Sequence, residues 1–256
     1  MRKSIYQISF ILLIGTAIIA PVSLKAQDRA SVRTTLFSDN SGLVVQAPLF
    51  QFLKSLSQSA SVAVQFLLDR VDIPPVRGIS GTPLATDAVT GASRPASNNP
   101  DADDDSFIKQ RSEFLATLSL GTLGFTGYYS NESDYIGRLV GVSINQDFAQ
   151  KNSNLALRVA YGNDTAMPTG RDSTLAKRTA LGNVTLTQVL STKTIMRLGA
   201  DVAYSQGLQS NPYRLVSVGG GNFLESHPNE RIRVAGFAKL NTYLQSMNAA
   251  LWLEYR

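Results

Sequence analysis

Alternating apolar and polar residues form the strongest pattern in this chain, and it is densest between Asp134 and Asn163. In the second half of that stretch every other residue is apolar, giving the set Leu155, Leu157, Val159 and Tyr161. In the first half the apolar set is Val140, Val142 and Ile144. Successive side chains of a strand point to opposite faces, so the stretch predicts an antiparallel hairpin with one apolar and one polar face.

The same alternation recurs after residue 26 and predicts about eleven strands. Besides the two strands of the hairpin, we expect them near Ala30–Ser38, Leu43–Lys54, Ala60–Val71, Arg111–Leu120, Phe125–Ser130, Thr179–Leu190, Met196–Tyr204, from Arg231 onward, and Ala249–Tyr255. A short helix over Pro48–Leu56 is an alternative to the second strand, because its apolar residues also fit helical spacing.

The predicted connections differ in length according to their parity. The third, seventh and ninth are long, at about residues 72–109, 163–178 and 207–230, whereas every even-numbered connection is short. In an up-and-down meander, odd and even connections lie at opposite ends of the strands. Long loops at one end and tight turns at the other are typical of outer-membrane β-barrels.

The distribution of charge along the strands supports the same architecture. Arg158, Arg197, Asp201 and Asp69 lie in mid-strand on the polar sides, as in a water-filled lumen, while the opposite sides carry almost no charge. We therefore predict an all-β chain forming an antiparallel up-and-down transmembrane β-barrel. The alternative is a soluble periplasmic β-sheet binding protein, because a soluble sheet with one buried face gives the same alternation on any single strand.

The N-terminus resembles a secretory signal peptide, with Arg2 and Lys3 preceding an apolar run from Ile8 to Ala20. We expect cleavage after Ala26, which leaves residues 27–256 as the barrel domain, with the long irregular loop at 72–109. Cleavage also removes Lys25, so the 24 basic residues fall by three against 19 acids and the net charge drops from +5 to roughly +2. This small excess argues against a nucleic-acid partner. An uncleaved membrane anchor is the alternative, but it needs a longer apolar run.

Three stretches resemble a known family of uncharacterised bacterial proteins. Asp87–Ser93, DAVTGAS, is similar to its DALTGAS-type motif, Tyr128–Phe148 is similar to its tyrosine-rich strand and following hairpin, and Asn211–Val218, NPYRLVSV, is similar to its NPYKLVSV segment. His227 and Asn229 depart from the family pattern. The resemblance implies a barrel in the outer membrane of a Gram-negative bacterium, in contact with membrane lipid. It also implies a C-terminally truncated member, because the family's sequence continues beyond the residues that match Tyr255 and Arg256.

Candidate chemistry is sparse in this sequence. The acidic run Asp101–Asp105 resembles the start of a calcium loop but lacks its glycine and its bidentate acid at the required spacing, so a solvated loop is the better interpretation. His227 is the single histidine and is accompanied by no G-x-S-x-G motif, and Gly219–Gly221 lacks the lysine of a phosphate loop. The chain has no cysteine. We expect no catalytic, cofactor-binding or metal-binding residues, and hence no enzyme.

The remaining candidates concern the ends of the predicted strands. Asp87–Ser93 and Asn211–Val218 fall in long loops at the same end, where they either constrict a mouth, bind a surface ligand or brace one another. Tyr128, Tyr129, Tyr135, Tyr161 and Tyr204 lie near strand ends, which suits an interfacial aromatic girdle. The predicted function is a non-enzymatic channel or surface scaffold whose substrate the sequence does not specify.

Overall fold

The computed structural model describes residues 28–40, 42–73, 107–167, 174–209, 215–219, 221–224 and 227–256. These residues form thirteen strands and one short 3-10 turn at Gln245–Met247. The strands are β1 (Arg29–Ser38), β2 (Val44–Ser55), β3 (Ala60–Ile73), β4 (Phe107–Leu120), β5 (Leu123–Glu132), β6 (Tyr135–Phe148), β7 (Ser153–Ala166), β8 (Leu175–Ser191), β9 (Thr194–Gly207), β10 (Leu215–Val218), β11 (Gly221–Leu224), β12 (Glu230–Leu244) and β13 (Ala249–Tyr255).

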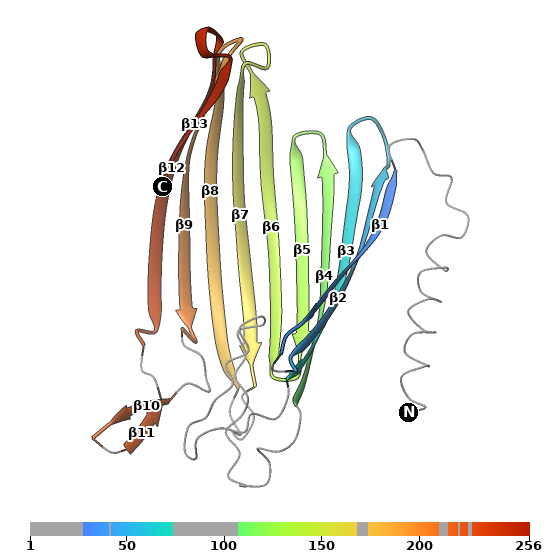
Figure 1. Cartoon of the computed structure of the whole chain (residues 1–256), viewed down its shortest axis with the longest axis vertical. Helices are drawn as coiled ribbons and strands as arrows, with labels where there is room; N and C mark the ends of the chain where they lie inside the picture. The colour runs from blue at the N-terminus through green and yellow to red at the C-terminus, as the bar shows by residue number, and fades with distance from the viewer. Residues whose placement is uncertain are drawn as a thin grey trace.

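Eleven of the strands form one antiparallel sheet in which each pairs with its neighbour along the chain, in the order β1 to β9, then β12 and β13 (Figure 1). The all-β, up-and-down architecture and the eleven strands of the prediction are confirmed. Within the described chain β1 and β13 each have a single neighbour, so the sheet is open. The two remaining strands, β10 and β11, form a separate hairpin that the sequence did not predict.

The two ends of the sheet differ as the connection lengths predict. At the upper end in Figure 1, which we call the turn end, β2–β3, β4–β5, β6–β7, β8–β9 and β12–β13 are joined by short turns. Three consecutive residues of the β6–β7 turn, Ala149, Gln150 and Lys151, have positive φ angles of 51°, 55° and 67°. The long connections lie at the opposite end, which we call the loop end.

Several boundaries differ from the sequence prediction. Pro48–Leu56 is not a helix: Val44–Ser55 is the strand β2, and the gap in the β2–β3 pairing at Ala47 and Pro48 coincides with the missing N–H of the proline. β4 begins at Phe107 instead of Arg111. β7 and β8 both extend further toward the loop end than predicted, which shortens their connection to residues 167–174.

Strand register gives the sheet two chemically different faces. One row of opposite partners crosses the sheet from β3 to β12 as Val62, Leu118, Phe125, Val142, Val159, Gly182, Val202 and Val234. We call the face that carries this row the apolar face. The neighbouring row on the other side, here called the polar face, contains Ser119, Gly124, Ser143, Arg158, Asn183, Asp201 and Ala235.

Charge is confined to the margins of the apolar face. In the described strands, every charged residue on the apolar face lies within four positions of a strand end. These residues are Lys54, Arg70, Asp72, Arg138, Arg178 and Glu230. Large apolar side chains in the middle of this face are exposed, including Val140 and Val159 at 65% each and Val234 at 74%. The sheet therefore carries an uncharged apolar band with charged margins.

The sheet has almost no core of its own. In the described part of the chain the buried hydrophobic side chains are only Val45, Val71, Ala160 and Ala166. No helix within the described ranges is long and apolar enough to cross a membrane.

Candidate functional site on the polar face

At the loop end of the polar face, Lys109 of β4 is buried between two carboxylates. Its side chain is 2% exposed, and its Nζ lies 2.9 Å from Asp134 Oδ1 and 3.1 Å from Glu132 Oε2. Burial lowers the pKa of Lys109, but the two carboxylates outweigh that effect and raise the pKa above its ordinary value. Lys109 is therefore held in its charged form.

Arg111 extends this charged cluster across three strands. Register places it opposite Asp69 on β3 and Glu132 on β5. Its Nη2 lies 3.3 Å from Asp69 Oδ2, and its Nε lies 3.1 Å from Glu113 Oε1 and 3.9 Å from Glu132 Oε1. We call these residues together with Lys109 and Asp134 the loop-end network. Because one arginine contacts acids on β3, β4 and β5, the network ties the loop ends of these strands together.

A second polar contact joins β6 and β7 beside this network. The Tyr135 hydroxyl donates to Asp164 Oδ2 at 2.6 Å, and the backbone N–H of Arg138 donates to Asp164 Oδ1 at 3.1 Å. Burial and the neighbouring Asp164 carboxylate both raise the pKa of Tyr135. Tyr135 and Tyr128 lie on the polar face, so the prediction that they belong to an outward aromatic girdle was wrong for these two residues.

The other three tyrosines of the predicted girdle lie on the apolar face. Tyr129 pairs opposite Phe114, and Tyr161 and Tyr204 both pair opposite Ala180. Tyr129 and Tyr161 are 44% and 48% exposed. This placement suits a girdle. Tyr128 and Tyr135 lie on the other face because successive residues of a strand point to opposite sides of the sheet.

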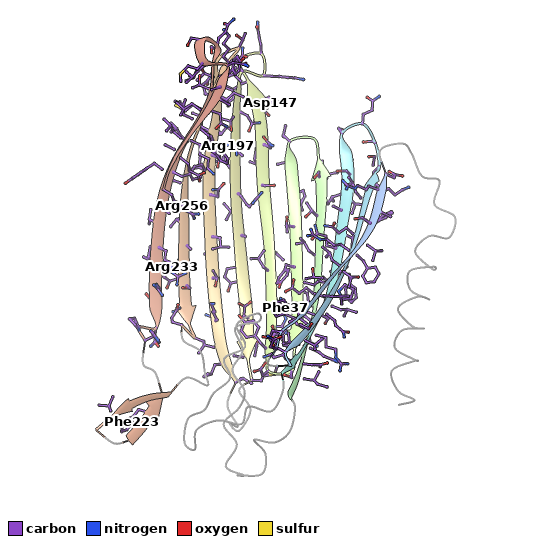
Figure 2. The ribbon with its side chains drawn as sticks, viewed as in Figure 1. Phe37, Asp147, Arg197, Phe223, Arg233 and Arg256 are labelled. Carbon is purple, nitrogen blue, oxygen red and sulfur yellow. The ribbon has the colours of Figure 1, made fainter. Side chains whose placement is uncertain are left out.

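A charged groove lies on the polar face of β8, β9, β12 and β13. It has a volume of about 190 Å³ and is lined by Thr185, Arg197, Asp201, Phe237, Lys239, Glu254 and Arg256. Lys239 Nζ lies 2.7 Å from Glu254 Oε1 and 5.8 Å from the centre of the Phe237 ring. Asp201 accepts a hydrogen bond from Asn183 Nδ2 at 2.6 Å and lies 3.9 Å from Arg256. Arg197 and Arg256 are labelled in Figure 2.

The charged residues predicted to lie on the polar sides of the strands are all found there. Asp69 belongs to the loop-end network, Asp201 and Arg197 line the groove, and Arg158 lies opposite Asn183 in the same row as Asp201. Asn183 of β8 lies between Arg158 and Asp201 in this row, and no ion pair joins the two charged side chains. In the described chain, these charged residues thus form separate groups on the polar face.

Sequence reasoning missed two parts of this surface. Lys109 was assigned to the long loop. It is separated from Arg111 and Glu113 by even numbers of residues, and this alternation could have placed it on the same face of a longer strand. The Lys239–Glu254 pair was missed because it depends on the register of β12 against β13. Single-strand patterns do not contain that register.

The remaining candidates lie mostly outside the described residues. His227 is exposed just before β12. Of Asn211–Val218 only the last four residues are described, as β10, and Asp87–Ser93, Asp101–Asp105 and the predicted signal peptide lie outside the described residues. No group of three or more His, Cys, Asp or Glu side chains in the described ranges is arranged to hold a metal ion.

Comparison with protein families places this sheet in a known group. The family model described as "Protein of unknown function (DUF3570)" matches residues 45–182 and 170–256, which extend from β2 to β13. The chain belongs to this family. No curated protein and no solved structure matches it. The family description gives no function, and the two chemically different faces of the sheet are the features that bear on function.

Proposed function

We propose that this member of the family is a β-barrel protein of the bacterial outer membrane, with its apolar face toward lipid and its polar face toward a water-filled lumen. It acts as a passage for solutes and not as an enzyme. The observation that carries this proposal is the uncharged apolar band, which continues across the sheet and has charge only at its margins.

The size of the apolar face is what favours lipid. Soluble monomers rarely expose contiguous apolar patches larger than a few hundred Å². Here exposed large apolar side chains occur on strands from Val32 on β1 to Leu253 on β13. Fully burying one such side chain is worth about 1.5–3 kcal/mol, so leaving the whole face in water is strongly unfavourable. A bilayer covers it without a second protein layer.

The strand dimensions also suit a membrane. A spanning β-strand needs about 9–11 residues when tilted. β6 and β7 have 14 residues each. The excess leaves room for polar residues beyond the lipid, where Asn163, Asp164 and Thr165 continue β7 toward the loop end.

The polar face supports an aqueous interior. Arg158 is exposed in the middle of β7, Asp201 lies in the middle of β9, and the charged groove lies on the same face. A charge in mid-strand is tolerated where the side chain meets water, and lumen residues of membrane barrels tune selectivity. The short turn end and the long-loop end agree with the asymmetry of such barrels.

Membrane extraction tests the proposal. The full-length protein, expressed in a Gram-negative host, should stay in the outer-membrane fraction after osmotic shock and high salt. It should need detergent for release, and an unboiled sample should migrate differently from a boiled one on a denaturing gel. Release by osmotic shock would contradict the proposal and favour the soluble periplasmic binding protein. Membrane insertion without conductance in planar bilayers would favour a scaffold for surface loops over a passage.

A further inference from the structure

The polar face carries an imbalance between its acids and its bases. The described acids on this face each have a hydrogen-bond or ion-pair partner; they are Asp69, Glu113, Glu132, Asp147, Asp164, Asp201 and Glu254. Several arginines on the same face have none among the described residues, namely Arg158, Arg197, Arg231 and Arg233. The unmatched charge on the polar face is therefore positive.

These four arginines, here called the arginine track, follow one another along the strands. Strand pairing gives the position of each arginine along β9. Arg231 lies opposite Ser205 and Arg233 lies opposite Ala203. Arg158 lies at the level of Asp201, because both pair with Asn183 of β8. Arg197 follows four residues closer to the turn end of β9. At about 3.3 Å per residue, the span from Ser205 to Arg197 corresponds to roughly 26 Å of strand. Figure 2 shows Arg233 and Arg197 at different heights on the sheet, with Arg256 between them.

The side chains of the track are exposed, so their guanidinium groups are available to a solute. The acid closest to the track in register is Asp201, which accepts a hydrogen bond from Asn183 Nδ2 at 2.6 Å and lies 3.9 Å from Arg256. Lys239 is neutralised by Glu254 at 2.7 Å. An anion moving along this face meets free cations at successive depths, with no unmatched carboxylate between them.

We propose that the arginine track makes the passage selective for small anions. The inference rests on the proposed outer-membrane barrel and adds the class of solute that its lumen prefers. Rings or rows of arginine and lysine favour anions in pores because each cation lowers the electrostatic barrier for an opposite charge. Spacing the cations along the strands provides several weak sites instead of one tight site, which permits a solute to leave as well as to enter.

The apolar face supplies a matched control for this proposal. Arg70, Arg138 and Arg178 lie within four residues of the loop end but face away from the lumen. The triple variant R70Q/R138Q/R178Q removes the same charge as R158Q/R197Q/R233Q. A change that follows from net charge alone would appear in both variants, whereas a change caused by the arginine track would appear only in the second.

The test is the reversal potential of the purified full-length protein in planar bilayers under a potassium chloride gradient. The wild type should prefer chloride to potassium, and this preference should weaken as ionic strength rises because salt screens the track. R158Q/R197Q/R233Q should lower the chloride-to-potassium permeability ratio by about threefold. R70Q/R138Q/R178Q should leave the ratio unchanged.

Several results would overturn the inference. Cation preference in the wild type, a preference that does not depend on salt, or an unchanged ratio in R158Q/R197Q/R233Q would each contradict it. Inserted protein that does not conduct would contradict it as well. Heat-dependent gel migration and detergent extraction of the same samples report whether the barrel itself forms, so failure of selectivity and failure of membrane insertion are distinguished. The salt dependence of the wild type tests the idea even if the triple variant does not fold.

Discussion

Val142 on β6 and Val159 on β7 are directly opposite each other on the apolar face, and their side chains are 46% and 65% exposed. The row continues to Phe125 on one side and through Gly182 to Val202 on the other. Two apolar side chains in adjacent strands would normally be covered in a soluble protein. Their exposure here identifies the apolar face as the surface that we propose contacts lipid.

The first prediction concerns a charge placed on this surface. Val159→Arg introduces a cation near the middle of β7, where the proposal places lipid. We expect a loss of about 2–4 kcal/mol in folding free energy in vesicles, because arginine is costly at the midplane of a membrane barrel. Denaturant titration followed by tryptophan fluorescence of the single Trp252 measures the loss.

The control for this substitution is Thr126→Arg, which introduces the same cation in mid-strand on the polar face. Thr126 lies opposite Thr117 and Gly141, whose small side chains leave space for it. We expect this variant to cost much less than Val159→Arg, because the new charge meets water. Equal losses for the two variants would contradict the assignment of the faces.

The second prediction concerns the loop-end network. Lys109→Met leaves Glu132 and Asp134, which are 8% and 12% exposed, without their shared cation. Breaking a buried ion pair on one side is strongly destabilising, and we expect a loss of about 3 kcal/mol in the free energy of unfolding. Lys239→Met breaks the more exposed pair with Glu254, at 32% and 41% exposure, and should cost about 1 kcal/mol or less. Similar losses for both would show that burial of the Lys109 cluster contributes nothing.

Sequence periodicity could predict the strands because the apolar band imposes strict alternation on them. It failed where that band ends. Asn163, Asp164 and Thr165 continue β7 through backbone pairing with β8, although their side chains show no apolar alternation. The four-residue strands β10 and β11 are too short to give a periodic signal. Strand existence was therefore predictable, whereas strand ends beyond the band were not.

The polar face was predictable only in part, for a related reason. Alternation assigned Asp69, Arg158, Arg197 and Asp201 to it correctly. Their partners depend on register between strands that are distant in sequence, as in the contact of Arg111 with Asp69 across 42 residues. Parity within one strand cannot fix such a register, because a slip of two residues preserves the faces and changes every pair.

The third prediction concerns the end of β9. Gly207 has a φ of +92°, and a Cβ at this position would collide with the backbone oxygen of Ala176. Gly207→Ala should cost about 1–2 kcal/mol from the backbone angle alone, with the steric conflict adding to it. Gly219 has a φ of +61° but nothing within 4 Å of an added Cβ, so Gly219→Ala should be milder. Thermal unfolding of both variants compares them, and a milder effect at Gly207 would contradict the close approach of β9 to β8.

The fourth prediction concerns alkaline pH. Tyr135 lies at the first position of β6, outside the proposed lipid band, and its pKa is raised by burial and by Asp164. A raised folded-state pKa stabilises the protonated phenol, so this contribution is complete below about pH 10 and is lost as the pH rises further. In Tyr135→Phe the hydrogen bond to Asp164 is absent. We expect the variant to be less stable at pH 8 and to lose less stability than the wild type above pH 10, as measured by denaturant titration. A parallel pH dependence in the two proteins would contradict this role.

The central claim is that the two sides of β7 face different solvents, and site-directed spin labelling tests it most directly. The chain contains no cysteine, so single cysteines introduced at consecutive positions from 155 to 161 can each carry a nitroxide without a background signal. In vesicles, labels at Leu155, Leu157, Val159 and Tyr161 should collide with lipid-soluble oxygen, and labels at Ala156, Arg158 and Ala160 with a water-soluble nickel complex. That alternation is the predicted result. Preferential access of the nickel complex to Leu157 and Val159, or uniform access along the strand, would contradict the account.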